Sequence, residues 1–371
     1  MRVDKTKWEK CSISNCCNIQ LGTRIVKKQA ENGSFPVYGG GGATFTTNTY
    51  NRENAILISR FALSKECTRF VTGKFFLNDS GLTIIPKNQS IIFDFLKWQI
   101  FSLNDKIYAL ARGAAQKNLD MKRFPLLPIV IPTLKEQQAI ASELDAIQTM
   151  IDGYKAQLAD LDALAQSIFL DMFGDPVTNQ KGWELHSIAS FGKIVTGNTP
   201  SKSIEKYYNS DYIEWIKTDN IQSNALYPTI ASEYLSKEGS LKGRIVEKNS
   251  ILVCCIAGSL SSIGKCCITN RKVAFNQQIN AIECNPQHNY LFSYWLIKCA
   301  QKIFMETAST GMKHILSKSV MSSIKLPVPA PSLQQQFANR VEAIEKQKEL
   351  IKSQLADAEI LMAERMQYYF S

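Results

Sequence analysis

The feature that most constrains this chain of 371 residues is an internal repeat. Residues 329–370 match residues 132–173 without a gap, at a constant offset of 197, and the run Lys-x-Gln-Leu-Ala-Asp at 155–160 recurs at 352–357. A repeat period near half the chain length indicates two related structural modules. We therefore expect a protein that presents two similar units in a fixed relation.

The two repeated segments predict long helices. Their apolar residues recur at alternating spacings of three and four, which gives each helix a narrow apolar stripe suited to packing against another helix. A proline cluster precedes each segment and fixes where its helix can begin. The helices would be rods on the order of 50 Å long. The stripes can bury each other if the helices pair within the chain, and the alternative is that each helix packs on its own domain.

The regions outside the repeat predict mixed α/β domains. Short β-branched and aromatic runs alternate with Gly, Asn and Ser turns, and helical spacing returns near the end of each region, at 91–110 and 290–306. The regions begin alike, at Trp8-Glu9 and Trp183-Glu184, but we find no alignment across their interiors.

These patterns together predict an α+β chain in four parts, with the two helices paired as an antiparallel coiled coil. The parts are a first globular domain at 1–131, a helical spacer at 132–176, a second globular domain at 177–328 and a second helical spacer at 329–371.

Charge is divided unevenly between these parts. The formal net charge of +10 at pH 7 consists of −6 in residues 132–175, −1 in residues 329–371 and +17 in the rest of the chain. Concentrated positive charge is typical of proteins that contact phosphates. The globular regions are therefore the candidates for nucleic-acid binding, and the acidic helices are the candidates for protein docking.

Several other classes of protein find little support. No apolar run approaches the length of a membrane span and the N-terminus leads into no signal-type apolar core, so we expect a soluble, cytoplasmic protein without a membrane partner. The adjacent cysteines Cys16-Cys17, Cys254-Cys255 and Cys266-Cys267 lack the Cys-x-x-Cys spacing of zinc or redox sites. We predict that they are reduced and mostly buried in strands.

No motif predicts a cofactor, a metal or a catalytic centre. The run from Gly258 to Lys265 resembles a phosphate loop, but it has five residues between its glycines instead of four, and Cys266 stands where Ser or Thr would bind Mg²⁺. His186, His288 and His314 are isolated from other possible metal ligands in the sequence.

Polar and basic residues near turns are the candidates for DNA contact. The glycine run 39–42 would let backbone amides approach a phosphate, although a hairpin turn explains it equally well. Tyr, Asn, Gln and Arg can stack on bases or bind base edges, and each has a solvated surface role as its alternative. The candidates are Tyr38, Gly40, Gly41, Asn51, Arg52 and Arg60 in the first region, and Thr199, Lys202, Lys217, Thr218, Asn276, Gln277, Gln278 and Lys313 in the second.

Short motifs accompany the repeat. They are Leu134–Ala141 and Leu333–Ala338 at the helix starts, Gly197–Ser201, Trp215–Asp219, Ile263–Lys265 and Asn276–Ile279 in the second region, and Pro36–Gly41 with the Arg60 segment in the first. With two unlike globular regions, each followed by a proline-led helix, they strongly resemble the specificity subunit of type I restriction-modification enzymes over essentially the whole chain. The first region resembles a different recognition-domain subtype from the second. Two departures are Ala62, where that subtype often has glycine, and Leu333, where the family usually has glutamate.

The resemblance implies a subunit that recognises double-stranded DNA without catalysis of its own. Two target-recognition domains would each read one half of a split site, in inverted orientation, and the paired helices would set their separation. Two methyltransferase subunits would dock on the helices, and restriction subunits would join them. The alternatives are a specificity subunit of a methylation-only or type II-like system, a coiled-coil scaffold that binds nucleic acid or membrane surfaces nonspecifically, and an enzyme acting alone.

Overall fold

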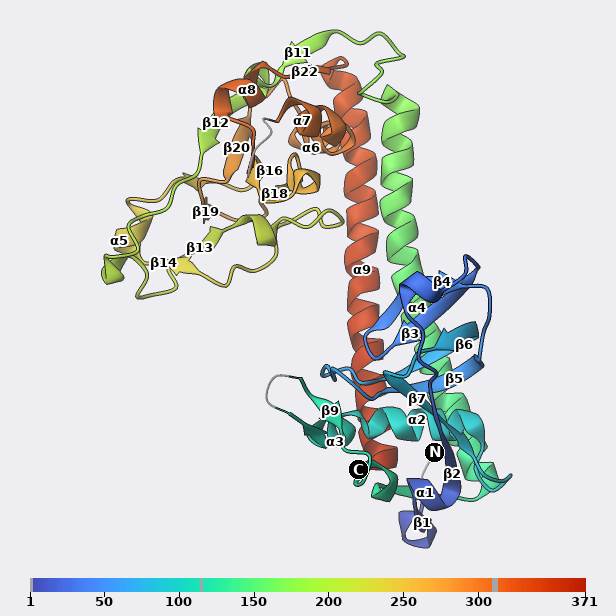
Figure 1. Ribbon diagram of the computed structural model, residues 1–371. Coiled ribbons are helices and arrows are strands. Elements are labelled where there is room, and N and C mark those ends of the chain that lie inside the picture. The colour runs from blue at the N-terminus through green and yellow to red at the C-terminus, as the bar shows by residue number, and fades with distance from the viewer. Residues whose placement is uncertain (1–2, 114–115, 309–312) are drawn as a thin grey trace. The chain divides into compact units, whose positions relative to one another are not determined.

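The computed structural model describes residues 3–113, 116–308 and 313–371 (Figure 1). The chain forms two compact units, one of Met1–Lys155 with Ser353–Ser371 and the other of Ala156–Lys352. The long helices α4 (Leu134–Phe173) and α9 (Pro331–Phe370) each contribute to both units, because the boundary between the units crosses them. We call these the first and the second unit.

A six-stranded sheet forms the centre of the first unit. Its neighbouring strands are antiparallel except β6 and β3, which are parallel. In sheet order the strands are β2 (Cys17–Leu21), β7 (Gly81–Pro86), β5 (Arg52–Ser59), β6 (Thr68–Leu77), β3 (Phe35–Gly39) and β4 (Gly42–Thr47). Because successive strand residues point to opposite faces, Ile56 and Ile58 enter the main core, whereas Ala55 and Leu57 pack with Phe75 on the other face.

Shorter elements complete the first unit. The helices α2 (Phe93–Ser102) and α3 (Asn104–Ala109) contribute buried residues to the main core. The strands β1 (Glu9–Ser12) and β10 (Pro128–Ile131) form one antiparallel pair, and β8 (Ala111–Arg112) and β9 (Asn118–Leu119) form another. The remaining helices are η1 (Lys5–Lys7), α1 (Ile13–Cys16), η2 (Lys27–Gln29) and η3 (Phe124–Leu126).

The second unit contains two four-stranded sheets. The first is antiparallel, in the order β12 (Gly192–Thr196), β20 (Ile279–Cys284), β16 (Ile251–Cys254) and β18 (Cys266–Ile268). The second has the order β14 (Tyr234–Leu235), β13 (Ile213–Ile216), β19 (Val273–Phe275) and β15 (Ile245–Val246), and its strands β13 and β19 are parallel.

Two strand pairs and short helices surround these sheets. The pairs are β11 (Leu185–Ser187) with β22 (Lys325–Pro327) and β17 (Ile256–Ala257) with β21 (His314–Ile315). The α-helices are α5 (Lys237–Ser240), α6 (Tyr290–Cys299), α7 (Gln301–Thr307) and α8 (Lys318–Ser323), and the 3-10 helices are η4 (Ile188–Phe191), η5 (Glu205–Tyr207), η6 (Thr218–Asn220) and η7 (Leu260–Ser262).

The internal repeat begins earlier than the sequence analysis predicted. Helices α2 and α6 start at Phe93 and Tyr290, which are separated by the same offset of 197 as the long helices. The buried side chains of Phe95, Trp98 and Ile100 recur as Phe292, Trp295 and Ile297. The statement that the interiors show no alignment was therefore wrong for this part. Each copy of the repeat includes a core helix as well as the long helix.

The predicted fold class is confirmed, since α4 and α9 pack against each other with opposite chain directions in each unit. In the first unit, Ile147 and Ile151 of α4 pack against Ala358 of α9. In the second unit, the rings of Phe169 and Phe337 lie 5.5 Å apart. The apolar stripe of each helix thus faces the other helix, as the spacing of three and four indicates.

One glutamine at the start of each long helix joins that helix to the core helix of its unit. The buried Gln137 accepts a hydrogen bond from Ile92 N (2.7 Å) at the start of α2 and donates to Pro132 O (2.9 Å). Gln334, at the offset of 197, accepts from Asn289 N (3.0 Å) at the start of α6 and donates to Pro329 O (2.9 Å). The repeated glutamines are therefore structural clamps between two elements of each copy.

The glutamate that the second copy lacks has a capping role in the first copy. Thr133 and Glu136 form a capping box, in which Glu136 N donates to Thr133 Oγ1 (3.3 Å) and Thr133 N donates to Glu136 Oε2 (3.0 Å). Helix α9, with Leu333 at the related position, begins instead with Pro331, which needs no N–H partner in the first turn.

The cysteines follow the prediction with one exception. Cys17, Cys254, Cys255, Cys266 and Cys267 are free and buried, whereas Cys16 forms a disulfide with Cys11. The prediction of a reduced Cys16 was therefore wrong, because the turn through α1 brings Cys11 beside it. Among the described residues, no helix combines the length and the apolar composition that a membrane span requires.

Candidate functional site

In the first unit, the end of strand β5 organises one cluster of predicted contact residues. Ser59 N donates to Cys67 O (2.8 Å), which closes the loop 60–66 that follows the strand. Leu119 N of β9 donates to Arg60 O (2.8 Å), and the Ser59 hydroxyl donates to Gly40 O (2.7 Å) in the β3–β4 hairpin. The loop is therefore held on one side by the glycine hairpin and on the other by β9.

The end of strand β16 builds the same frame in the second unit. Cys254 N donates to Lys265 O (2.8 Å), which closes the loop 255–264. Leu316 N donates to Cys255 O (2.7 Å), and Cys255 N donates to Gln278 O (2.8 Å). Leu316 and Leu119 are related by the offset of 197. The two loops, which differ in sequence and length, therefore share the hydrogen bond that closes them and the one from the related leucine, whereas the third hydrogen bond differs.

The glycine hairpin of the first unit has one fixed glycine and one exposed glycine. Gly40 is buried, its N donates to Ser80 Oγ (3.2 Å), and a Cβ there would lie 2.8 Å from Phe61 O. Gly41 is exposed, and no atom lies within 4 Å of the Cβ position. The glycine run thus forms a hairpin turn between β3 and β4. Gly41 is the part of this turn that a phosphate could approach.

Three other predicted residues of the first unit use their polar or aromatic groups internally. Tyr38 packs on Phe75, with ring centroids 5.3 Å apart. Asn51 accepts from Leu77 N (2.6 Å) and donates to Leu77 O (3.1 Å). Arg52 donates to Thr83 Oγ1 (2.9 Å), Asn51 O (2.7 Å) and Leu21 O (2.9 Å). These contacts give each residue a role in holding strands together.

Arg60 is half-buried like Arg52, but its guanidinium makes fewer hydrogen bonds within the protein. Its guanidinium carbon lies 4.6 Å from the ring centroid of Phe61, and Nη1 makes a long hydrogen bond to Asp79 O (3.4 Å). The loop continues through Ala62, whose φ of 50° lies in the left-handed region that favours glycine. The glycine common at this position in the resembled subtype thus has a backbone reason.

The predicted polar residues of the second unit mostly bond to one another. Asn276 is buried, donates to Gln278 Oε1 (3.0 Å) and accepts from Gln278 N (3.0 Å). The Thr199 hydroxyl donates to the side-chain oxygen of the exposed Gln277. The motif Asn276–Gln278 therefore fixes its own loop, and the Gln277 side chain is its most accessible member.

The two predicted lysines share one acid over one tryptophan. Lys202 Nζ lies 3.2 Å from Glu233, and Lys217 Nζ lies 2.5 Å from it. Their ammonium groups lie 5.5 and 5.9 Å from the ring centroid of Trp215. The hydrogen bond from Lys217 is the largest cause of a lowered pKa of Glu233. One carboxylate thus balances one of the two positive charges.

An open cavity of about 570 Å³ brings three of the sequence motifs together. Its wall includes Thr218, Lys265 and Gln278, from segments far apart in the sequence. The last of the predicted residues, Lys313, is exposed and directly precedes β21, which pairs with β17 in the loop that follows β16. Lys265 was not in the predicted set, although the motif Ile263–Lys265 pointed to this segment.

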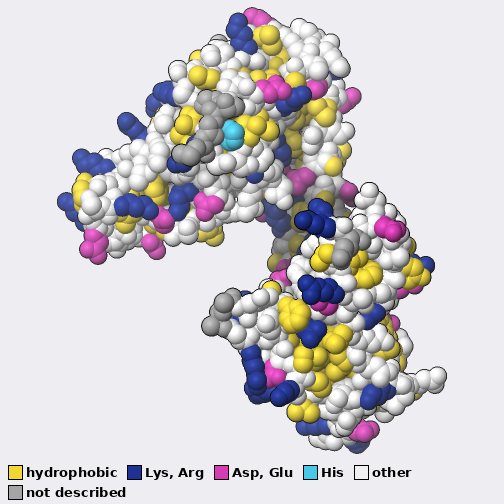
Figure 2. All heavy atoms as spheres, viewed as in Figure 1, with side chains coloured by type: hydrophobic (Ala, Val, Ile, Leu, Met, Phe, Trp, Pro, Cys, Tyr) yellow, Lys and Arg dark blue, Asp and Glu magenta, His cyan; other side chains and the backbone are white. Residues whose placement is uncertain are grey.

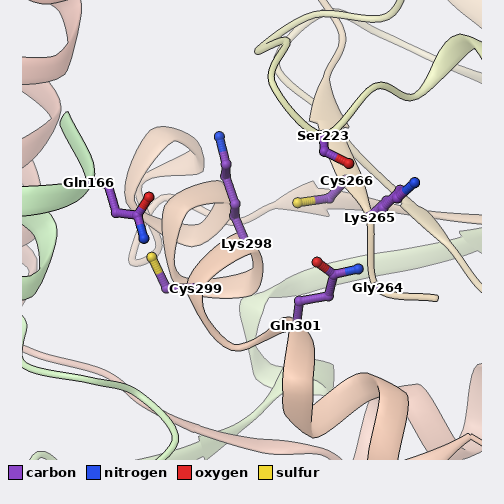
Figure 3. A pocket seen from close by; sticks show the side chains of 8 residues that line it. All are labelled: Gln166, Ser223, Gly264, Lys265, Cys266, Lys298, Cys299 and Gln301. Atoms are coloured by element: carbon purple, nitrogen blue, oxygen red, sulfur yellow. The ribbon is translucent and has the colours of Figure 1, made fainter. Parts of the chain in front are cut away.

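A smaller cavity of about 210 Å³ adjoins the same wall through Ser223 and Lys265 (Figure 3). The ammonium groups of Lys265 and Lys298 point in different directions there and do not converge on one ligand. Burial raises the pKa of the Cys266 and Cys299 thiols to about 12, so both are protonated at neutral pH. Within the described residues, no group of His, Cys, Asp and Glu could hold a metal ion.

The residue Asn198 shows what sequence reasoning missed. Its Nδ2 donates to Lys242 O (2.7 Å) and its Oδ1 accepts from Arg244 N (2.7 Å). The motif Gly197–Ser201 therefore holds a basic turn that lies more than forty residues later in the chain. The cations Lys242 and Arg244 around Gly243 were the available signal, but nothing in the sequence tied them to Asn198.

The frames, the antiparallel helices and the duplicated core helix define a class of two-domain proteins built on an internal repeat. The sequence profile described as "Type I restriction modification DNA specificity domain" matches this chain twice, at residues 5–162 and 180–359. The chain belongs to this family.

Curated relatives match parts of the chain. The HindI specificity subunit of Haemophilus influenzae is 30% identical over 169 residues, which are 44% of this chain and 36% of that protein. The MjaIX specificity subunit of Methanocaldococcus jannaschii is 27% identical over 166 residues, which are 43% of this chain and 37% of the relative. The chain thus aligns with little more than a third of the length of either relative.

Solved structures show the same fold over the whole chain. The S subunit of a type I restriction-modification system from M. genitalium has a TM-score of 0.63 at 17% identity and covers 100% of this chain and 98% of its own. A chain from a structure of a type I R-M system, described for complex assembly and conformational transition, has a TM-score of 0.54 at 13% identity, with coverages of 98% and 97%. At these identities the likeness extends to the fold alone.

Proposed function

We propose that this chain is the DNA-recognition subunit of a type I restriction-modification complex, without catalysis of its own. Each unit would contribute one target-recognition domain, so that the two domains read the two halves of a split duplex site. The observation that carries the proposal is the duplicated frame, in which β5 and β16 end in loops of unlike sequence, each held by a closing hydrogen bond and by one from the related Leu119 or Leu316. A constant frame with a variable loop is what two readers of different half-sites need.

Several groups on these frames match the chemistry of DNA. Gly41, Lys313 and Gln277 are exposed and offer a backbone amide and side-chain donors near the loops, and the half-buried Arg60 offers a guanidinium there. Arg and Gln bind base edges in the major groove, whereas lysines mainly neutralise phosphates. The internally bonded Asn51, Arg52 and Asn276 would position the readers. The partner methyltransferase would act on an adenine flipped out of the duplex.

Two exposed leucines support two docking sites for partner subunits. Leu164 on α4 and Leu361 on α9 are exposed and are related by the offset of 197. Each would therefore occupy the same place in its copy of the repeat, on a helix whose segment carries net negative charge. We propose that one methyltransferase subunit docks at each place and that restriction subunits join this assembly, which would work on DNA in the cytoplasm.

Competition binding tests the proposal. The chain is assembled with its methyltransferase partner, and a bipartite duplex, identified by mapping methyladenine in the host genome, competes with a scrambled duplex. We expect the bipartite duplex to win by at least about a thousandfold. Equal competition would point to the nonspecific scaffold, and methyladenine formed by the chain without its partner would point to an enzyme. Cleavage assays separate a restriction complex from a methylation-only one.

A further inference from the structure

One turn of the second unit presents an exposed apolar side chain directly before two exposed cations. Leu241 is 81% exposed, the highest value among the large apolar side chains of the described residues. The neighbouring Lys242 and Arg244 are exposed, and neither forms an ion pair within the described part of the chain. The turn follows α5, at the end of the unit where Lys and Arg side chains gather (Figure 2).

The backbone of this turn is fixed before any ligand binds. Asn198 bridges it through the 2.7 Å hydrogen bonds to Lys242 O and Arg244 N described above. Lys242 N and Gly243 N both donate to Gly239 O, at 3.0 and 2.9 Å. Gly239 lies so close to η5 that a Cβ there would be 2.2 Å from Tyr207 O. A side chain on such a turn loses little backbone entropy on binding.

We propose that the turn Leu241–Arg244 is a DNA wedge of the second recognition domain, an inference that rests on the proposed function. Leu241 enters a groove and packs against a base step, while Lys242 and Arg244 bind the flanking phosphates. Leucine is among the side chains that other proteins insert between base steps, at an unstacking cost of a few kcal/mol. The wedge would loosen the duplex beside the base that the partner enzyme must flip.

Charge favours DNA over a protein surface as the occupant. Lys206 of η5 and Lys237 of α5 are also exposed, and their helices are joined by the hydrogen bond from Ser236 Oγ to Lys206 O (2.6 Å). The turn and the two adjoining helices thus carry four exposed cations against the two exposed acids Glu205 and Glu238, a net positive charge. DNA can bind both kinds of side chain: its phosphates pair with the cations, and a base step that opens offers an apolar surface to the leucine.

The test compares two variants and two controls in the assembled complex, on a bipartite duplex with 2-aminopurine placed in turn at each step of the second half-site. Leu241→Ala should weaken specific binding about tenfold or more, since a buried leucine side chain contributes about 1.5–3 kcal/mol. It should also abolish the 2-aminopurine fluorescence increase at one step. Lys242→Ala/Arg244→Ala should reduce the slope of log K against log[salt] by about 2, because two phosphate contacts are lost.

The controls separate a wedge from a loss of structure. Leu241→Met should restore binding and fluorescence, and Leu185→Ala, at another leucine of the same unit that is 51% exposed, should change neither. The inference is overturned if Leu241→Ala leaves both signals unchanged, or if it weakens assembly with the methyltransferase instead of DNA binding. Failure of the unaltered complex to prefer the bipartite duplex would instead refute the proposed function.

Discussion

In each unit, the contact between α4 and α9 contains one buried position that is related to the other by the repeat, and the two positions hold opposite chemistry. In the first unit, Ile151 is 4% exposed and packs with Ile147 and Ala358. In the second unit, the position at the offset of 197 holds Lys348, which is 5% exposed. Its Nζ lies 2.7 Å from Asp162 of the facing helix. This one position is thus apolar in the first copy and ionic in the second, although the second unit keeps apolar contacts between the helices, such as Phe169 with Phe337.

This difference shows that a buried side chain can change from apolar to charged between the copies while the two helices keep their antiparallel packing. Lys348 Nζ also lies 2.8 Å from Glu345, so two carboxylates surround the buried ammonium group. Burial alone would lower the pKa of Lys348, but the hydrogen bonds to Asp162 and Glu345 outweigh it and raise that pKa. The lysine therefore stays charged, and its location depends on both acids. The first unit has no such requirement at Ile151.

The largest expected effect is the loss of this ion cluster. Lys348→Ala leaves the half-buried Glu345 and Asp162 without their shared cation, so we expect a loss of about 4 kcal/mol in the free energy of unfolding. Urea unfolding followed by far-ultraviolet circular dichroism measures it. Replacement of Ile151 by a smaller apolar residue would instead measure what apolar packing contributes to the free energy of unfolding.

Two further variants decide whether the charge is responsible. Lys352→Ala removes an exposed lysine one turn away that pairs with Glu349 at 2.8 Å, and it should cost less than about 0.5 kcal/mol. Lys348→Met with Asp162→Asn and Glu345→Gln replaces the cluster by neutral groups of similar size and should retain most of the stability. Equal losses in Lys348→Ala and Lys352→Ala would show that the cluster is unimportant.

The second largest effect should distinguish the two glutamine clamps. Gln137 donates a third hydrogen bond, to Ser90 O (2.8 Å). Among the described contacts, Gln334 makes no corresponding bond. We expect Gln137→Ala to cost about 3 kcal/mol and Gln334→Ala about 2 kcal/mol, because each leaves buried backbone groups unpaired. Tryptophan fluorescence during unfolding reports both units. The exposed neighbour Gln138→Ala serves as the control, and a similar loss there would contradict the clamp.

Features with a short sequence period could be predicted, and features that depend on distant partners could not. The stripe from Ile140 onwards predicts α4 because it repeats every three or four residues. The relation of α2 to α6 was missed because only three of the ten aligned residues are identical, among them Trp98 and Trp295. Arg52 was predicted as a DNA contact, whereas its partners Leu21 and Thr83 lie about thirty residues away on either side.

The third effect concerns how each long helix begins. Thr133→Ala removes the capping box of α4 and should cost about 1 kcal/mol. Glu136→Gln keeps a hydrogen-bonding side chain at the same place and should cost less. Leu333 takes no part in a capping box but packs against the core of the second unit, so Leu333→Met, which keeps an apolar side chain of similar size, should be nearly neutral. Chemical denaturation of the three variants side by side measures the ranking, and a loss in Leu333→Met as large as in Thr133→Ala would contradict it.

The smallest effect should be a gain, at Ala62 in the loop 60–66, since the loop 255–264 has no non-glycine residue at positive φ. Ala62→Gly relieves a φ of 50° that costs alanine about 1 kcal/mol, but glycine also adds entropy to the unfolded chain. We expect a net stabilisation of about 0.5 kcal/mol, measured as a higher midpoint of unfolding. Ala43→Gly on β4, an exposed alanine outside the positive-φ residues, should instead destabilise by a similar amount. If both substitutions lower the midpoint, the left-handed conformation of Ala62 stores no strain, and the loop 60–66 tolerates alanine as well as it would glycine.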